Sequence, residues 1–328
     1  MRLFSIKKTV SLLLAGLLAS GACACSAAGA GTDSGKLKVV TTIFPEYDWV
    51  REIAGDRLAD IDLTMLLDNG VDMHSFQPAA QDIIKISTCD VFVYVGGESD
   101  GWVEDALKEA VNKNMQVVNL LDLLGESVVE EELVEGMQAE EAEDEDKEEP
   151  EYDEHVWLSL RNAQVLVTGI ADAMGKADPA NADTYKANAE AYNSRLSGLD
   201  DRYREAVAGG AKDTVLFGDR FPFRYLTDDY SLKYYAAFAG CSAETEASFE
   251  TVVFLSGRLD ELGLKTVLVI ENADQSIART VIDNTAAKDQ EILVMDSMQA
   301  TTSADSAKGV TYESVMEKNL EVLKKALG

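Results

Sequence analysis

The chain has 328 residues, with 59 Asp and Glu against 29 Lys and Arg, a formal net charge of −30, and only two histidines. This negative charge excludes a protein that binds nucleic acid through its phosphates, and it disfavours a basic helix that lies on a membrane surface. The length and the hydrophobic share of 46% predict a globular protein with two domains of ordinary size.

The first 25 residues have the pattern of a secretory signal sequence. Three basic residues precede an apolar run at 10–19, which ends in small residues around Cys23 and Cys25. The run is shorter than the roughly 18 residues that a membrane span needs. Small residues that run into a cysteine resemble a bacterial lipobox, so either Cys23 or Cys25 is expected to carry a lipid. Residues 26–36, rich in Gly, Ala and Ser, are predicted to be a flexible tether at the outer face of the cell membrane.

From residue 37 the chain alternates β-rich runs with helical ones, which is typical of α/β units with a mostly parallel sheet. Strands are predicted at 37–42, 61–66, 90–95 and 116–120, and helices at 45–54, 78–87 and 101–114. Together they predict an N-terminal lobe over 37–178. Ligands of such sheets bind beyond the carboxyl ends of the strands, and the loop after the second strand carries His74.

An acidic block interrupts this lobe. Residues 126–154 contain sixteen carboxylates and one lysine, Lys147. Because such a block repels itself and has few apolar residues to bury, we predict a mobile, solvated loop. Carboxylates without imidazole bind transition metals loosely, but they raise the cation concentration near a cleft.

Residues 179–209 predict one long helix with an apolar stripe at spacings of four and three, which ends at Gly209 and Gly210. A second α/β series then predicts a C-terminal lobe over 210–328. Its strands are expected at 214–217, 233–238, 266–271 and 291–295, and its helices at 248–262, 276–287 and 311–326. The predicted fold class is therefore α/β, with two similar lobes around mostly parallel sheets and one rigid helix that joins them.

The two histidines and the two cysteines beyond the predicted signal sequence are the next candidates for a chemical role. His74 and His155 both lie in acid-flanked loops, where a histidine is either a surface residue or a metal ligand. Cys89 and Cys241 are far apart in the sequence, and we expect two buried free thiols and no cysteine metal cluster.

Several segments, in order, resemble bacterial metal-binding receptors that feed zinc or manganese ABC transporters. Residues 39–45 are similar to the family's first strand, 70–78 to its first ligand loop, and 153–157 to its second ligand segment. The same resemblance extends to Gly97, Glu98 and Trp102, to the helix start at 178–181, to Glu271 and to 295–297.

The resemblance implies which residues hold the metal. Two ligands fall on His74 and His155, and a carboxylate ligand of the second lobe falls on Asp296. Gly218 occupies the place of the remaining ligand and has no side chain to offer. We expect Asp219 to replace it; the alternative role for Asp219 is the N-cap of the following helix.

A site of two imidazoles and carboxylates suits Zn²⁺ or Mn²⁺, and the order of intrinsic affinities favours zinc. The resemblance implies an extracytoplasmic receptor that captures the divalent ion between its lobes and delivers it to an ABC permease with its ATPase. The alternatives are a manganese receptor, a surface adhesin, or a secreted zinc metalloenzyme. The sequence has no HExxH motif and no spare imidazole for acid-base chemistry, so we expect no enzyme.

Overall fold

The computed structural model describes residues 35–138, 152–242 and 246–328. Leu37–Gly328 form one compact unit. The predicted signal sequence, Cys23 and Cys25 lie outside the described residues. Within the described part of the chain, no helix has both the length and the apolar character that a membrane crossing requires.

Strands and helices alternate through both halves of the unit. The first half contains β1 (Leu37–Thr41), α1 (Phe44–Ala54), β2 (Ile61–Met65), α2 (Ala80–Thr88), β3 (Val91–Tyr94), α3 (Val103–Lys108), β4 (Gln116–Asn119), α4 (Leu120–Leu124) and α5 (Leu160–Ala177). The second half, after α6 (Ala182–Gly209), contains β5 (Thr214–Phe221), α7 (Arg224–Tyr230), β6 (Lys233–Ala239), α8 (Phe249–Leu262), β7 (Thr266–Ile270), α9 (Ser276–Asp283), β8 (Glu291–Met295), α10 (Ser303–Ala307) and α11 (Tyr312–Leu327). Short 3-10 helices are η1 (Gly55–Asp60), η2 (Met73–Ser75), η3 (Gly125–Ser127) and η4 (Val156–Leu158).

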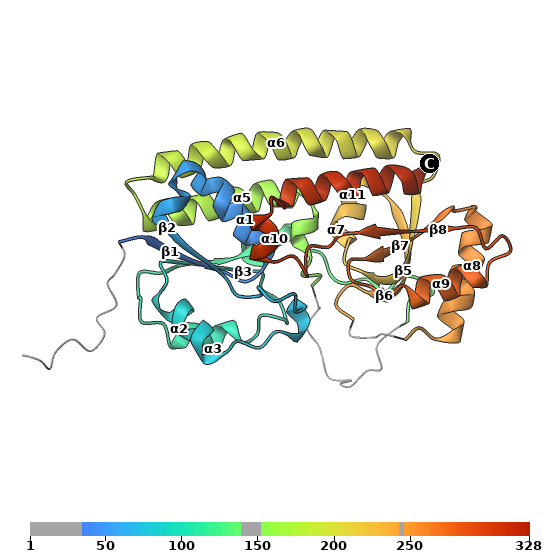
Figure 1. Ribbon diagram of the computed structural model, residues 1–328, viewed down its shortest axis with the longest axis horizontal. Coiled ribbons are helices and arrows are strands. Elements are labelled where there is room, and N and C mark those ends of the chain that lie inside the picture. Colours follow the sequence, from blue (N-terminus) through green and yellow to red (C-terminus); the bar gives the residue numbers. More distant parts are fainter. Residues whose placement is uncertain (1–34, 139–151, 243–245) are drawn as a thin grey trace, which may run out of the picture. The chain divides into compact units, whose positions relative to one another are not determined.

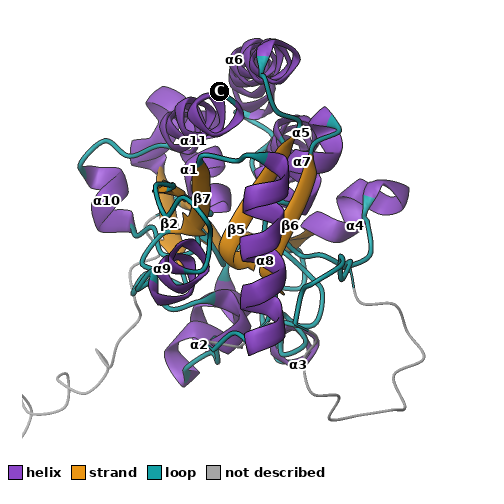
Figure 2. Ribbon diagram, turned by 90° about the vertical axis from the view of Figure 1, so that its right-hand side faces the viewer, coloured by secondary structure: helices purple, strands orange, loops and turns teal. Residues whose placement is uncertain are grey.

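The eight strands form two four-stranded sheets, ordered β2-β1-β3-β4 and β6-β5-β7-β8. All described pairings within them are parallel. Every residue of β7 is buried, as expected for a strand covered on both faces. Helices α8 and α9 pack against the second sheet on one side, and α11 packs against it as well (Figure 2). The predicted α/β class with two lobes is therefore confirmed.

The helices differ from the prediction where side chains compete with the backbone. A helix was predicted at 101–114, but α3 ends at Lys108. Beyond it, the side-chain amide of Asn112 donates to the carbonyl of Cys89 at 2.7 Å, and its Oδ1 accepts from the backbone of Asn114 at 3.0 Å. Such bonds favour a turn over a helix. The short helices α4, α7 and α10 were not predicted.

Helix α6 runs beside both lobes (Figure 1). It packs on α1 and α5 of the first lobe and on α7 and α11 of the second. The predicted apolar stripe is buried: Tyr185, Ala189, Tyr192, Leu196, Leu199 and Tyr203. Arg195 on this helix bonds Glu52 of α1 at 2.5 Å and Glu313 of α11 at 2.9 Å. One side chain of α6 thus contacts a carboxylate of each lobe.

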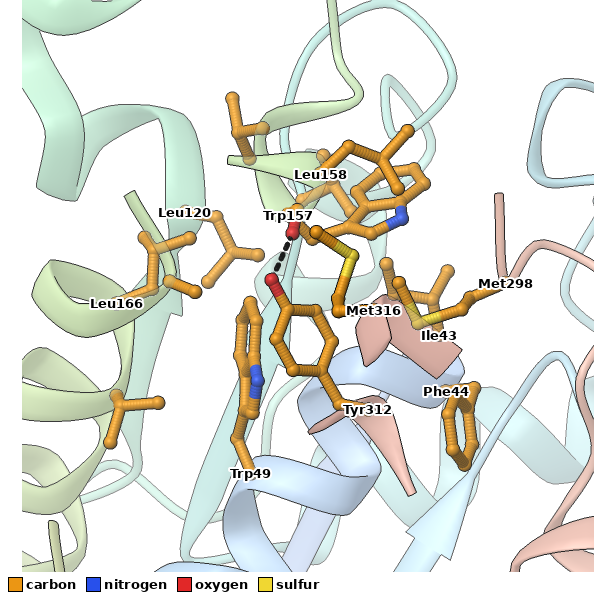
Figure 3. Close-up of a cluster of buried hydrophobic side chains, with 14 of the residues drawn as sticks. Ile43, Phe44, Trp49, Leu120, Trp157, Leu158, Leu166, Met298, Tyr312 and Met316 are labelled. Carbon is orange, nitrogen blue, oxygen red and sulfur yellow. Dashed lines mark hydrogen bonds between the residues drawn. The ribbon is translucent and has the colours of Figure 1, made fainter. Parts of the chain in front are cut away.

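The lobes also share a buried core, which the sequence did not predict. Tyr312, at the start of α11, packs edge-on against Trp49 of α1, with ring centroids 5.2 Å apart (Figure 3). Its hydroxyl donates to the carbonyl of Trp157 at 2.6 Å, and its backbone N–H donates to Asp48 at 2.8 Å. The Trp157 indole donates to the carbonyl of Ser297 at 2.9 Å. The helix α6 is therefore one of several connections between the lobes.

The acidic block is only partly the free loop that we expected. Residues 126–138 run along the second lobe, where Gln138 donates to the carbonyl of Ala237 at 3.0 Å. Glu135 pairs with Arg258 at 2.9 Å. Gly136 lies so close to the Phe254 ring that an added Cβ would be 2.0 Å from it. The expectation of a solvated loop does not hold for this part, whereas residues 139–151 lie outside the described residues.

Candidate metal centre

His74 lies in η2, in the loop that follows β2. The carboxylate of Asp72 accepts from the backbone N–H of His74 at 3.1 Å, which fixes the start of this turn. The ring Nδ1 lies 2.8 Å from the hydroxyl of Ser99 and 3.6 Å from a carboxylate oxygen of Glu154. The Nδ1 side of the ring is therefore held by polar partners, and the Nε2 side is turned away from them.

His155 directly precedes η4 and is fully buried. One oxygen of Asp153 accepts from its backbone N–H at 2.8 Å and contacts its ring Nδ1 at 3.0 Å. Because an ionised carboxylate only accepts, this contact assigns the proton of a neutral ring to Nδ1. The Nε2 of His155 then presents a lone pair, which is the tautomer that metal-binding histidines use.

The two Nε2 atoms face each other at 3.4 Å. Two imidazole nitrogens bound at about 2.0–2.1 Å to a tetrahedral zinc ion lie roughly 3.3–3.4 Å apart. The observed spacing therefore matches that of two ligands of one ion. Among the described residues, no other partner within hydrogen-bond distance is found for Nε2 of His155.

The surroundings keep one of these rings neutral. Burial first, and then the positive charge of His155, lower the pKa of His74 to about 4. Burial also lowers the pKa of His155, but Asp153 and other carboxylates outweigh it, so the net pKa is raised. At most one of the two rings is therefore positively charged near neutral pH, and a divalent cation can supply that positive charge instead.

A cavity of about 550 Å³ lies between the lobes and reaches His74, whereas His155 is buried behind it and does not line it. Asp72 and His74 of the first lobe line it together with Asp219, Arg220 and other residues of the second. Arg220 donates to Asp72 across the cavity at 2.6 Å. Ligands from both lobes can thus reach one ion.

Neither predicted carboxylate ligand is in contact with the histidine pair. Asp219 lies within β5, and its oxygens accept from the backbone of Arg220 at 2.8 Å and of Ile270 at 3.1 Å. It does not cap α7, whose N-cap is Phe223. Asp296 accepts from the backbone of Met298 at 2.8 Å, and burial, followed by repulsion from Glu271, raises its pKa to about 6. Their predicted roles as ligands stay predictions.

The side chain near the two histidines is that of Cys241. Within the described residues, one group of metal-ligand side chains has its ligand atoms within 4.8 Å of one another, and it consists of His74, His155 and Cys241. Cys241 follows β6, whose carboxyl end lies beside that of β5. It was not predicted as a site residue. The signal that could have identified it was its position directly after a predicted strand, at the edge where ligands bind.

Two α/β lobes with a candidate metal site between them define a two-lobed binding protein. The family model for the zinc-uptake complex component A, periplasmic, matches residues 39–326, and the chain belongs to this family. The resemblance inferred from the ligand loops is thereby confirmed.

Curated relatives and solved structures agree with this family. The chain is 33% identical over 321 residues to the zinc-binding lipoprotein AdcA of Streptococcus pneumoniae, covering 97% of this chain and 60% of that protein. It is 31% identical to the high-affinity zinc uptake system protein ZnuA of Bacillus subtilis, with 96% of each covered. The solved Zn(II)-bound ZnuA-like domain of the pneumococcal AdcA has a TM-score of 0.68 and 29% identity, over 89% of this chain and 99% of that one.

Proposed function

We propose that the protein is an extracytoplasmic receptor that binds zinc between its lobes through His74 and His155 and passes it to an ABC permease. The spacing of 3.4 Å between their Nε2 atoms carries this proposal. Both rings have their Nδ1 atoms occupied by polar neighbours, and both Nε2 atoms are directed at one point. The zinc-binding and zinc-uptake names of the relatives support zinc over manganese, and a receptor over an enzyme or an adhesin.

The shared core limits how the ion is captured. Hinge-bending receptors close by rotation of lobes on flexible connections. Here α6 and the contacts of Tyr312 hold the lobes together, which supports rearrangement of the loops around the cavity as the response to metal. The ion would select the arrangement in which ligands of both lobes reach it.

The domain organisation belongs to the same proposal. Residues 1–25 would direct export, Cys23 or Cys25 would anchor the chain to the membrane through a lipid, and 26–36 would be the tether. The N-terminal lobe would span 37–178, the linking helix 179–209 and the C-terminal lobe 210–328. The partner would be a membrane permease with its ATPase; that the relative in Bacillus subtilis is named a protein of a high-affinity zinc uptake system supports a role in transport.

His74→Ala and His155→Ala variants test the site. After removal of bound metal with a chelator, titration calorimetry with Zn²⁺ should give one tight site in the parent. We expect each variant to lose more than the roughly 100-fold in affinity that removal of an outer-shell partner can cost. Zinc binding as tight as the parent's in either variant would show that the site is elsewhere.

Asp219→Asn and Asp296→Asn provide the matching test for the carboxylates. Because both carboxylates are engaged with backbone N–H groups, we expect a change of less than about tenfold from each. A loss as large as that of the histidine variants would instead make that aspartate a ligand.

A further inference from the structure

The histidine pair offers two donors, whereas zinc in proteins takes three or four. The third side chain at this point is Cys241, whose Sγ belongs to the group of ligand atoms within 4.8 Å of one another. Cys89, the other cysteine among the described residues, is not in this group. It is buried, and its Sγ lies 3.3 Å from the sulfur of Met115.

The backbone next to Cys241 is built for close approach to His155. An added Cβ on Gly240 would lie 3.0 Å from Cε1 and 3.1 Å from Nδ1 of the His155 ring, and 2.9 Å from the carbonyl of Phe221. A residue with a side chain would push the ring and the strand end apart. Glycine therefore allows β6 to place Cys241 directly at the imidazole.

A residue of the acidic segment 126–138, Glu131, also holds the backbone of Cys241 in place. The carboxylate of Glu131 accepts from the N–H of Cys241 at 3.1 Å. Burial, and then the nearby charge of Glu131, raise the pKa of the Cys241 thiol well above its usual range. Without a metal the group is thus a neutral thiol, and a bound zinc ion removes the proton from such a ligand.

We propose, on the basis of the proposed function, that Cys241 is the third protein ligand of the transported ion. Around a tetrahedral zinc, a nitrogen at about 2.05 Å and a sulfur at about 2.3 Å lie roughly 3.6 Å apart. The spacing of up to 4.8 Å between the ligand atoms then closes by a small shift of the Cys241 side chain. The thiol loses its proton to solvent on binding, and the thiolate bonds the ion.

This ligand sets the specificity of the site. Two imidazoles and one thiolate form a borderline-soft donor set, which suits Zn²⁺ and disfavours Mn²⁺ and Mg²⁺, which prefer oxygen. The thiolate supplies a negative charge at the ion, whereas Asp72 is already neutralised by Arg220. Selection against manganese thus depends on Cys241.

Cobalt spectroscopy tests the bond directly. The full chain with Cys23→Ser and Cys25→Ser retains only the thiols of Cys89 and Cys241. With Co²⁺ it should show the near-ultraviolet thiolate-to-cobalt charge-transfer band and the intense visible bands of tetrahedral coordination. Adding Cys241→Ser should abolish the charge-transfer band, and the matched Cys89→Ser should retain it.

The outcomes separate this inference from the proposed function. If the parent binds Co²⁺ and Zn²⁺ with a histidine-dependent affinity but has no charge-transfer band, Cys241 is not a ligand and the receptor function stands. If the parent binds neither ion, the proposed function itself fails.

Metal selectivity gives a second readout that does not depend on the spectrum. Cys241→Ser should lower zinc affinity by more than about tenfold, the lower end of the cost of losing an outer-shell partner, and leave manganese affinity nearly unchanged. The ratio of zinc to manganese affinity should therefore fall. An unchanged ratio in a folded Cys241→Ser variant would overturn the inference.

Discussion

At the scale of single residues, Asp153 decides which nitrogen of His155 faces the site. Its carboxylate is buried and accepts both the backbone N–H and the ring Nδ1 of His155. A carboxylate in this position fixes the ring orientation and makes the metal-binding nitrogen more basic. The histidine pair thus depends on a residue that contacts no ion.

We expect Asp153→Asn to reduce zinc affinity by about 10–100-fold, because an uncharged amide is a weaker acceptor and can reverse the tautomer. Titration calorimetry measures this change. Asp201→Asn, at an exposed pair with Arg204, is the control and should bind zinc as the parent does. Equal affinities of both variants would show that Asp153 does not position the ring.

At the scale of an element, the start of α1 contains an acid that is shielded from solvent. Glu46 is fully buried, and one of its oxygens accepts from the backbone of Thr42 at 2.7 Å and from that of Ile43 at 3.3 Å. No partner is found among the described residues for its other oxygen. Burial, and then repulsion from Asp100, raise the pKa of Glu46 to about 8. The folded protein therefore holds this side chain in its protonated form at neutral pH.

A raised acid pKa makes stability depend on pH in a defined direction. Between the unfolded pKa of 4.5 and the folded pKa of about 8, the folded state binds more protons, so the free energy of unfolding falls as pH rises. A difference of one between the folded and unfolded pKa corresponds to roughly 1.4 kcal/mol. Asp48 and Asp100, with pKa values raised by burial to about 6 and about 7, act in the same direction.

We expect Glu46→Gln, which mimics the neutral acid, to flatten this decline by on the order of 2 kcal/mol between about pH 5 and about pH 8. Urea unfolding of the metal-free protein at several pH values provides the measurement. The same pH slope in the parent and the variant would mean that Glu46 is ionised in the folded state.

At the scale of the whole molecule, the two sheets belong to one folding unit. Leu37–Gly328 are compact as a whole, and one buried cluster includes Trp49 of the first lobe and Tyr312 and Met316 of the second. Such a core makes independent unfolding of the lobes costly, because unfolding of one lobe would expose to water the aromatic surface that it covers on the other lobe.

We therefore predict that the metal-free protein unfolds in one calorimetric transition, and that zinc moves that transition to higher temperature. Zinc at about 100 times its dissociation constant should add about 2.7 kcal/mol to the free energy of unfolding. The His74→Ala variant should unfold in a single transition that zinc does not move. Two separate transitions in the parent would show that the lobes are independent domains.

The sequence alone determined what depends on local patterns. Strand and helix positions follow from the spacing of apolar residues, and seven of the eight strands end within two residues of their prediction, while β5 extends to Phe221. His74 and His155 could be singled out because each lies in a loop whose neighbours resemble known ligand segments.

Only the tertiary structure decided what fills the rest of the site. Cys241 is 86 residues from His155, by the difference of their numbers, and no local pattern joins them. It reaches the histidines because parallel strands bring their carboxyl ends to one edge and because Gly240 lets the backbone approach. Asp219 has the right residue type, but its carboxylate accepts from the backbone N–H of Arg220 and from that of Ile270 on the neighbouring strand β7. Residue type is written in the sequence, whereas the direction of a side chain depends on contacts between distant segments.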